Sequence, residues 1–207
     1  MNEALHKTRN EALIELQNVY KSYGGTPVLR GVSLALVPGA PVCVTGRSGI
    51  GKTTLLRLIL GLERPDSGAV SVRKGARFAA VFQENRLIAH LSAADNVRFV
   101  CPAAAMPDAA ALAGAFAAVG LTRQEMEKTV SALSGGQQRR TALLRALLAP
   151  ADAVLLDEPF TGLDAEARRA AAAYIQKMCA HRALLCITHE AGDAELLGAR
   201  MLTLTEL

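Results

Sequence analysis

The chain has 207 residues, 51% of them hydrophobic and 20% charged, so it can bury a substantial core and does not have the composition of a disordered protein. The net charge of +4 is modest and only 4% of the residues are aromatic, which argues against nucleic-acid binding and is equally compatible with a polyanionic ligand or an acidic membrane surface. No apolar run approaches the roughly 18 residues of a membrane helix, and residues 1–11 lack the apolar core of a signal peptide, so we expect a cytoplasmic protein.

The first part of the chain predicts strands separated by glycine turns. After a frayed or weakly helical lead over residues 1–12, alternating apolar residues predict two strands joined through Gly24-Gly25, and Pro38-Gly39 provides the next turn. Two later strands are expected to form a pair around a turn at Lys74-Gly75. The predicted strands cover 13–19, 28–36, 42–45, 69–72 and 77–82, and a core-packed helix covers 55–60.

The second part of the chain is mainly helical until strand signals return near its end. Asp108 is expected to cap a helix that runs to Val119 and ends at Gly120. Thr122–Glu125 and Ser134–Gln137 have the form of capping boxes, and the helix after the second box stops before Pro150. The last predicted elements are strands over 153–156 and 184–187 with a helix over 165–180 between them. Cys43 and Cys186 fall in predicted buried strands, where we expect reduced thiols.

A glycine-rich turn between the strand 42–45 and the following helix fits the phosphate-binding pattern G-x-x-x-x-G-K-[ST]. Its residues are Gly46, Arg47, Ser48, Gly49, Ile50, Gly51, Lys52, Thr53 and Thr54. The glycines allow backbone N–H groups to approach an anion, Lys52 is expected to reach the β- and γ-phosphates, and the Thr53 hydroxyl to hold Mg²⁺. A chance glycine turn is the alternative, but the strand before the motif and the helix after it favour a nucleotide site.

Two carboxylates follow the apolar run Val154–Leu156. A buried parallel strand delivers the residues at its C-terminal end into the crevice where α/β sheets bind ligands. Asp157 there suits the Mg²⁺ shell, and Glu158 can accept a proton from an attacking water or orient it. The alternative is a solvated turn after a strand, which the phosphate-binding motif makes less favourable.

A serine and two glycines begin the helix after Leu133, in the order Ser134, Gly135, Gly136 and Gln137. By themselves they indicate either a helix cap or an anion site. Together with the phosphate loop and Val154–Pro159, they resemble the nucleotide-binding subunit of ABC transporters. In that family the serine-glycine motif is the signature sequence, which binds the γ-phosphate of ATP held by the opposite subunit.

The resemblance implies roles for further residues. Gln83 matches the Q-loop glutamine, a contact to Mg²⁺ and water that joins the core to the helical insert. His189 matches the switch histidine, whose imidazole would bond the γ-phosphate and the attacking water. Asp164 matches the D-loop aspartate at the dimer interface, although Thr-Gly replaces the more usual Ser-Ala before it. Tyr23 matches the aromatic that stacks on adenine; Tyr20 competes for this role but is expected to pack inside.

The resemblance therefore implies an α/β fold: a P-loop ABC ATPase core with an antiparallel β subdomain and an all-helical insertion. It covers residues 13–207 as one ABC ATPase domain, with the α/β core and β subdomain over 13–83 and 150–207 and the helical subdomain over 84–149. The implied cofactors are ATP and Mg²⁺, the metal being held by Thr53, Gln83 and Asp157. Glu158, His189 and Gln83 are the expected catalytic residues, acting in a head-to-tail dimer with ATP between the subunits.

The implied partners are a second ATPase subunit, identical or paralogous, integral-membrane permease subunits, and a solute-binding protein, with no nucleic acid. The protein would lie on the inner face of the cell membrane through its permease. The phrasing of 81–87 and Asn96-Val97 is similar to the nitrate/sulfonate/taurine importer ATPases, which favours import of small anions or organic solutes. An ABC ATPase of a cell-division or lipid-handling machine is the alternative, and a nucleotide switch without turnover is disfavoured by Glu158 and His189. Leu87 and its apolar neighbours either dock a permease helix or pack within the insert.

Overall fold

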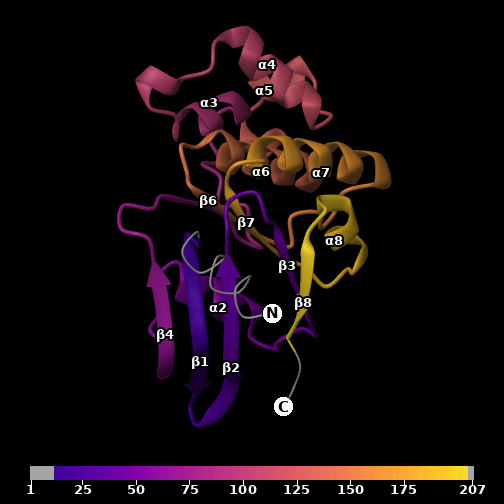
Figure 1. Ribbon diagram of the computed structural model, residues 1–207. Coiled ribbons are helices and arrows are strands. Elements are labelled where there is room, and N and C mark those ends of the chain that lie inside the picture. The colour runs from indigo at the N-terminus through magenta and orange to yellow at the C-terminus, as the bar shows by residue number, and fades with distance from the viewer. Residues whose placement is uncertain (1–11, 205–207) are drawn as a thin grey trace.

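The computed structural model describes residues 12–204, which form two β-sheets and a group of helices (Figure 1). The expected lead over 1–12 lies outside the described residues except for Ala12. The strands are β1 (Ile14–Tyr23), β2 (Thr26–Leu36), β3 (Val42–Thr45), β4 (Ser67–Val72), β5 (Phe78–Val81), β6 (Ala153–Asp157), β7 (Ala183–Ile187) and β8 (Arg200–Thr203). The α-helices are α2 (Lys52–Ile59), α3 (Ala93–Arg98), α4 (Ala109–Ala118), α5 (Arg123–Glu127), α6 (Gly135–Leu148), α7 (Ala165–Cys179) and α8 (Gly192–Leu197), with 3-10 turns at Ala103–Ala105 and Val130–Ala132.

A parallel sheet in the order β5-β6-β7-β3-β8 divides the hydrophobic core in two. Every residue of β3, β6 and β7 is buried, as expected for strands covered on both faces. Successive side chains alternate between the two cores: Val154 and Leu156 face the helices, whereas Leu155 packs with α2 and the other sheet. The carboxyl ends of the parallel strands therefore lie between two packed layers.

The second sheet is antiparallel, in the order β2-β1-β4, and β1 and β2 form a hairpin. Its turn is the predicted Gly24-Gly25, where both residues have positive φ (55° and 81°) that glycine adopts without strain. The predicted pairing of the strands around Lys74-Gly75 is wrong. β4 pairs with β1, whereas β5 pairs with β6 in the parallel sheet. Burial explains the difference, because β4 is mostly exposed and forms an edge, while Ala79 and Val81 of β5 are buried.

Three of the helices begin at the predicted capping residues. The Asp108 carboxylate accepts from Ala111 N (2.7 Å) at the start of α4, and capping boxes at Thr122 and Ser134 start α5 and α6. Helices α6 and α7 cover one face of the parallel sheet, and α3, α4 and α5 lie on the far side of α6 (Figure 1). The four cysteines are buried and free, as predicted for reduced thiols.

Two elements at the end of the described chain were not predicted. Helix α8 is followed by β8, which pairs in parallel with β3 from Val42 opposite Arg200 to Thr45 opposite Thr203. The alternation of Met201, exposed, with Leu202, partly buried, was the available signal, but four residues at a sheet edge give little periodicity. Within residues 12–204, no helix has both the length and the apolar character needed to span a bilayer.

Candidate active site

The glycine-rich turn connects β3 to α2, as its motif requires. Gly51 has φ 108°, and a Cβ there would lie 2.7 Å from the Val28 side chain, so only glycine fits at the entrance to the helix. Lys52, the first residue of α2, is 9% exposed and its Nζ donates to the carbonyl oxygens of Gly46 (2.6 Å) and Arg47 (3.1 Å). Because an ammonium group has three N–H donors, one remains for an anion at the mouth of the turn.

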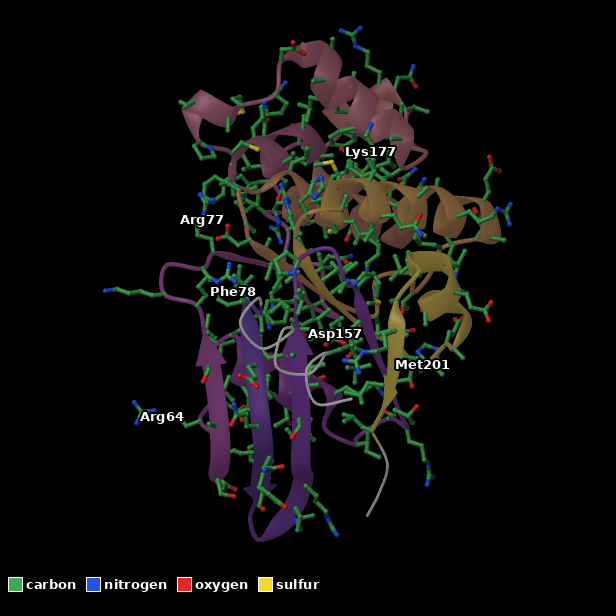
Figure 2. All side chains as sticks on the ribbon, viewed as in Figure 1. Arg64, Arg77, Phe78, Asp157, Lys177 and Met201 are labelled. Atoms are coloured by element: carbon green, nitrogen blue, oxygen red, sulfur yellow. The ribbon has the colours of Figure 1, made fainter. Side chains whose placement is uncertain are left out.

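Asp157 and Glu158 lie at the carboxyl end of β6, beside the phosphate loop. Asp157 is 4% exposed, and its Oδ2 is 3.5 Å from the Thr53 hydroxyl. Burial raises the pKa of the Asp157 carboxyl, the neighbouring Glu158 carboxylate adds to this, and the Arg139 guanidinium opposes it. Figure 2 shows Asp157 near the centre of the molecule, between the antiparallel sheet and the helices.

Glu158 contacts the predicted switch histidine directly. The Nδ1 atom of His189, in the loop after β7, is 2.7 Å from Glu158 Oε2. The Glu158 backbone has φ 53°, a left-handed conformation uncommon outside glycine, and its N–H donates to Ile187 O (2.8 Å). The carboxylate and the imidazole thus form a hydrogen-bonded pair, and each residue follows the carboxyl end of one of two adjacent strands, β6 and β7.

One cavity of about 530 Å³ brings most of the predicted site residues together. Its lining includes Tyr23, Ser48, Gly49, Gly51, Lys52, Thr53, Thr54, Gln83, Asp157, Glu158 and His189. These residues come from five separate segments of the chain, from the β1–β2 hairpin to the loop after β7. The cavity therefore combines an anion-binding turn, a buried carboxylate and a Glu–His pair.

The remaining predicted residues are placed elsewhere among residues 12–204. Gly46, Arg47 and Ile50 belong to the phosphate loop without lining this cavity. The signature residues Ser134–Gln137 form the N-terminal turn of α6, where Ser134 Oγ accepts from Gln137 N (3.3 Å) and Gln137 Oε1 accepts from Ser134 N (2.8 Å). Asp164 caps α7 by accepting from Ala167 N (2.8 Å). The signature turn and Asp164 also lie outside the cavity lining.

Comparison with known proteins identifies this arrangement. The family described as "ABC transporter" matches residues 29–161, more than half of the chain and the region from the phosphate loop to Glu158. The chain belongs to the ABC transporter family. The ABC cassette MJ0796, whose structure was solved as a dimer in a post-hydrolysis state bound to ADP and Pi, superimposes with a TM-score of 0.80 at 26% identity, over 93% of this chain and 94% of that one. The predicted family and P-loop ABC fold are confirmed.

Two kinds of named ABC relatives illustrate the likeness. The aliphatic sulfonates import ATP-binding protein SsuB 3 of Nocardia farcinica is 40% identical over 96% of this chain and 79% of its own length. The spermidine/putrescine import ATP-binding protein PotA of Legionella pneumophila is 36% identical over 88% of this chain and 54% of its own length. The chain thus spans about half the length of the PotA relative it matches.

The predicted adenine-side tyrosine lies in the ABC cavity, but the expectation for its neighbour is wrong. Tyr23 lines the cavity, is 44% exposed, and its hydroxyl bonds the Glu63 carboxylate. Tyr20 was expected to pack inside, yet it is 46% exposed. Its hydroxyl lies over Gly31, where a Cβ would come within 3.0 Å, so the ring is held on the outer face of the β1–β2 hairpin. Because glycine has no Cβ, position 31 leaves room for the Tyr20 ring on this surface.

Several residues around the ABC cavity were missed by sequence reasoning. Thr161 lines it. Arg168 pairs with Glu190 and Asp193, and Asp193 accepts from Thr188, which fixes the loop carrying His189. Arg139, 3% exposed, bonds the backbone beside both carboxylates. Its signal was present, because position 139 shares the buried face of α6 with 142, 143, 146 and 147.

The residues beside the phosphate loop fit a magnesium ion. The oxygen atoms of Thr53 and Asp157 are close together, and Gln83 lines the same cavity. Among residues 12–204 no group of three or more His, Cys, Asp or Glu is arranged as a metal site. Proteins that bind Mg²⁺ together with substrate phosphates supply few ligands of their own, often one or two carboxylates. The Asp157 carboxylate with the Thr53 hydroxyl and the Gln83 amide oxygen is such a ligand set.

Proposed function

We propose that this chain is the ATP-binding and ATP-hydrolysing subunit of an ABC importer. The observation that carries the proposal is the single cavity in which the phosphate loop, Gln83, Asp157, Glu158 and His189 meet. ABC family membership and the ADP- and Pi-bound cassette of the same fold support the choice of nucleotide.

ATP would bind with its base beside Tyr23 and its phosphates in the turn from Gly46 to Thr54. The free N–H groups at the start of α2 and the unoccupied donor of Lys52 would hold the phosphate oxygens. Thr53, Gln83 and Asp157 would hold Mg²⁺, which when bound neutralises charge on the phosphates. Burial raises the pKa of the Asp157 carboxyl, and a bound cation would oppose that change by favouring the ionised form.

Hydrolysis would rest on the pair formed by Glu158 and His189. Because phosphoryl transfer to water depends mainly on positioning and charge stabilisation, the protein's task is to orient the water and stabilise the transferring group. The Glu158 carboxylate is suited to accept a hydrogen bond or a proton from the water. The other ring nitrogen of His189, Nε2, lies 3.9 Å from Glu190 Oε1, beyond hydrogen-bond distance, and would face the γ-phosphate.

A second subunit would complete the site. Support comes from the position of Ser134–Gln137 and Asp164, which lie outside the cavity that holds the phosphate loop. In a head-to-tail dimer each subunit would cover its partner's ATP with this N-terminal turn of α6. The related cassette MJ0796 was solved as a dimer.

The assembled pair would drive a membrane permease from the inner face of the membrane, with residues 84–149 acting as the helical subdomain that faces the permease. The named relatives are import ATP-binding proteins, which supports import over a cell-division or lipid-handling role. Among possible cargoes, small anions and organic solutes such as sulfonates are supported by the SsuB relative, because the match covers most of both chains (96% of this chain and 79% of the relative). A solute-binding protein would deliver the cargo.

The Glu158→Gln variant tests the proposed chemistry. It keeps the size and hydrogen-bonding capacity of the side chain but removes its ability to take a proton. We expect ATP to bind with unchanged affinity, hydrolysis to fall by about 100-fold or more, and an ATP-dependent dimer to accumulate. Nucleotide binding, phosphate release and size-exclusion chromatography with Mg²⁺-ATP measure the three quantities. Normal hydrolysis by this variant would refute the role of Glu158.

A further inference from the structure

Arg139 is a buried cation of α6 that lies behind the residues lining the cavity. Its Nη1 donates to Phe82 O (2.6 Å) and Asn85 Oδ1 (3.1 Å), and its Nη2 donates to Glu158 O (2.7 Å) and to Asp157 O. One side chain of α6 thus ties together the segment around Gln83 and the carboxyl end of β6. Burial of this charge lowers the pKa of the guanidinium, while the charges of Asp157 and Glu158 oppose that change.

The two carbonyl oxygens bonded by Nη2 lie on either side of a strained residue. Glu158 has φ 53°, and a non-glycine residue in this region costs about 1 kcal/mol or more. The carbonyl of Asp157 precedes the Glu158 φ rotation, and the carbonyl of Glu158 follows its ψ rotation. Hydrogen bonds to both therefore fix the two peptide planes that set the direction of the Glu158 side chain.

The same helix repeats this arrangement at a second residue. Arg145 donates from Nη1 to Arg86 O (2.7 Å) and from Nη2 to Asn85 O (3.1 Å), and Arg86 has φ 48°. Among the described residues, Asn18 is the third non-glycine residue with positive φ, and it lies on β1. An arginine of α6 thus holds each of the other two, and only the one held by Arg139 carries a carboxylate of the cavity.

We propose that Arg139 is a positioning residue for hydrolysis: by bonding the carbonyls of Asp157 and Glu158 it holds Glu158 in the left-handed conformation that directs its carboxylate to His189 and to the attacking water. This inference rests on the proposed ATPase function and adds to it a group that touches neither nucleotide nor water. Without Arg139 the Glu158 backbone relaxes toward a commoner region, and the carboxylate moves away from the imidazole.

The test compares Arg139→Met with Arg145→Met, which removes the same kind of clamp from a residue outside the cavity. A misplacement of about 1 Å costs about 100-fold in rate, so we expect kcat of Arg139→Met to fall by about 100-fold. The KM and Kd for ATP should stay within about threefold of the wild type, since Arg139 bonds only backbone carbonyls of cavity residues and does not itself line the cavity. Arg139→Lys should recover part of kcat, and Arg145→Met should keep kcat within about threefold of the wild type.

Two further readouts separate positioning from general weakening of the fold. Hydrogen exchange without nucleotide should accelerate over 157–161 in Arg139→Met and over 85–88 in Arg145→Met. In a double-mutant cycle under single-turnover conditions, Arg139→Met should add no further loss to Glu158→Gln, because both act through one carboxylate. If Arg139→Met does not fold, Arg139→Lys against Arg145→Lys provides the same comparison.

Equal loss of kcat in the Arg139 and Arg145 variants, parallel loss of ATP affinity, or additive loss with Glu158→Gln would overturn the inference. Unchanged exchange over 157–161 in Arg139→Met would also overturn it. A wild-type protein that does not hydrolyse ATP would instead refute the proposed function, and the exchange comparison would still decide whether Arg139 fixes the Glu158 backbone.

Discussion

At the scale of one residue, Asp157 shows how a group placed for function destabilises the folded state. The carboxyl is buried, so the folded protein binds its proton more tightly than the unfolded chain, for which the ordinary pKa is 3.8. Below pH 3.8 the group is neutral in both states and has no effect. As pH rises from 3.8 through the raised pKa, the folded state loses stability, because the ionised carboxylate is disfavoured where it is buried.

Asp157→Asn should therefore raise the melting temperature at pH 7.5, and the gain should shrink as the pH falls toward 4. Asp152, at the other end of β6, is a matched control of opposite sign. The backbone N–H of Arg77 donates to Asp152 (2.8 Å) and lowers the pKa of its carboxyl, so its stabilisation is present at neutral pH and is lost in acid. Asp152→Asn should lower the melting temperature at pH 7.5. Thermal unfolding at pH 7.5, 5.5 and 4 checks both; a lower melting temperature for Asp157→Asn at pH 7.5 would contradict the argument.

At the scale of the elements, what the sequence predicted depends on the range over which each interaction acts. The caps at Asp108, Thr122 and Ser134 were predicted because the cap and its partner are three residues apart. The partners of β4 and β5 were not, because sheet membership is decided by burial against distant strands.

The phosphate loop and the strand-end carboxylates followed from local motifs, but the roles of individual side chains depended on the fold. The contact between Glu158 and His189 joins the segments that follow two different strands, and Arg139 acts on backbone that no motif describes. Leu87, for which docking and packing were both open, is partly buried against the core beside α6, which favours packing for that residue. Its neighbours Ile88 and Leu91 are also half-buried.

The cap of α6 gives a prediction at this scale. Ser134→Ala removes the acceptor for Gln137 N and should lower stability by about 1 kcal/mol. Asp108→Ala removes the equivalent acceptor at α4 and should cost about the same. Of these two variants only Ser134→Ala should also lower hydrolysis, because the N-terminus of α6 is proposed to meet nucleotide and that of α4 is not. Urea midpoints and steady-state phosphate release measure the two effects. Equal loss of hydrolysis in both variants would reduce the signature turn to a structural cap.

At the scale of the whole molecule, the parallel sheet explains why the chain keeps two parts of the proposed nucleotide site apart: the cavity with the phosphate loop, and the signature turn. Its strands end between two packed layers, and β3, β6 and β7 deliver the phosphate loop, the carboxylates and His189 to one cavity. The signature turn starts a helix on one face of this sheet, away from that cavity. A single chain therefore contains both complementary parts of the proposed composite site without bringing them together.

This separation predicts complementation between two inactive variants. Lys52→Ala removes the phosphate-binding ammonium but leaves the signature turn, whereas Ser134→Arg blocks the signature turn but leaves the phosphate loop. Each variant alone should be inactive, because both sites of its head-to-tail dimer carry the same defect. In a mixture, a heterodimer pairs the intact loop of one chain with the intact signature turn of the other. Random association makes half of the dimers mixed, each with one intact site, so an equimolar mixture should reach about a quarter of wild-type hydrolysis if the sites act independently. Steady-state phosphate release against mixing ratio measures this, with a peak expected at equal amounts; a mixture as inactive as its components would show that each site is built within one chain.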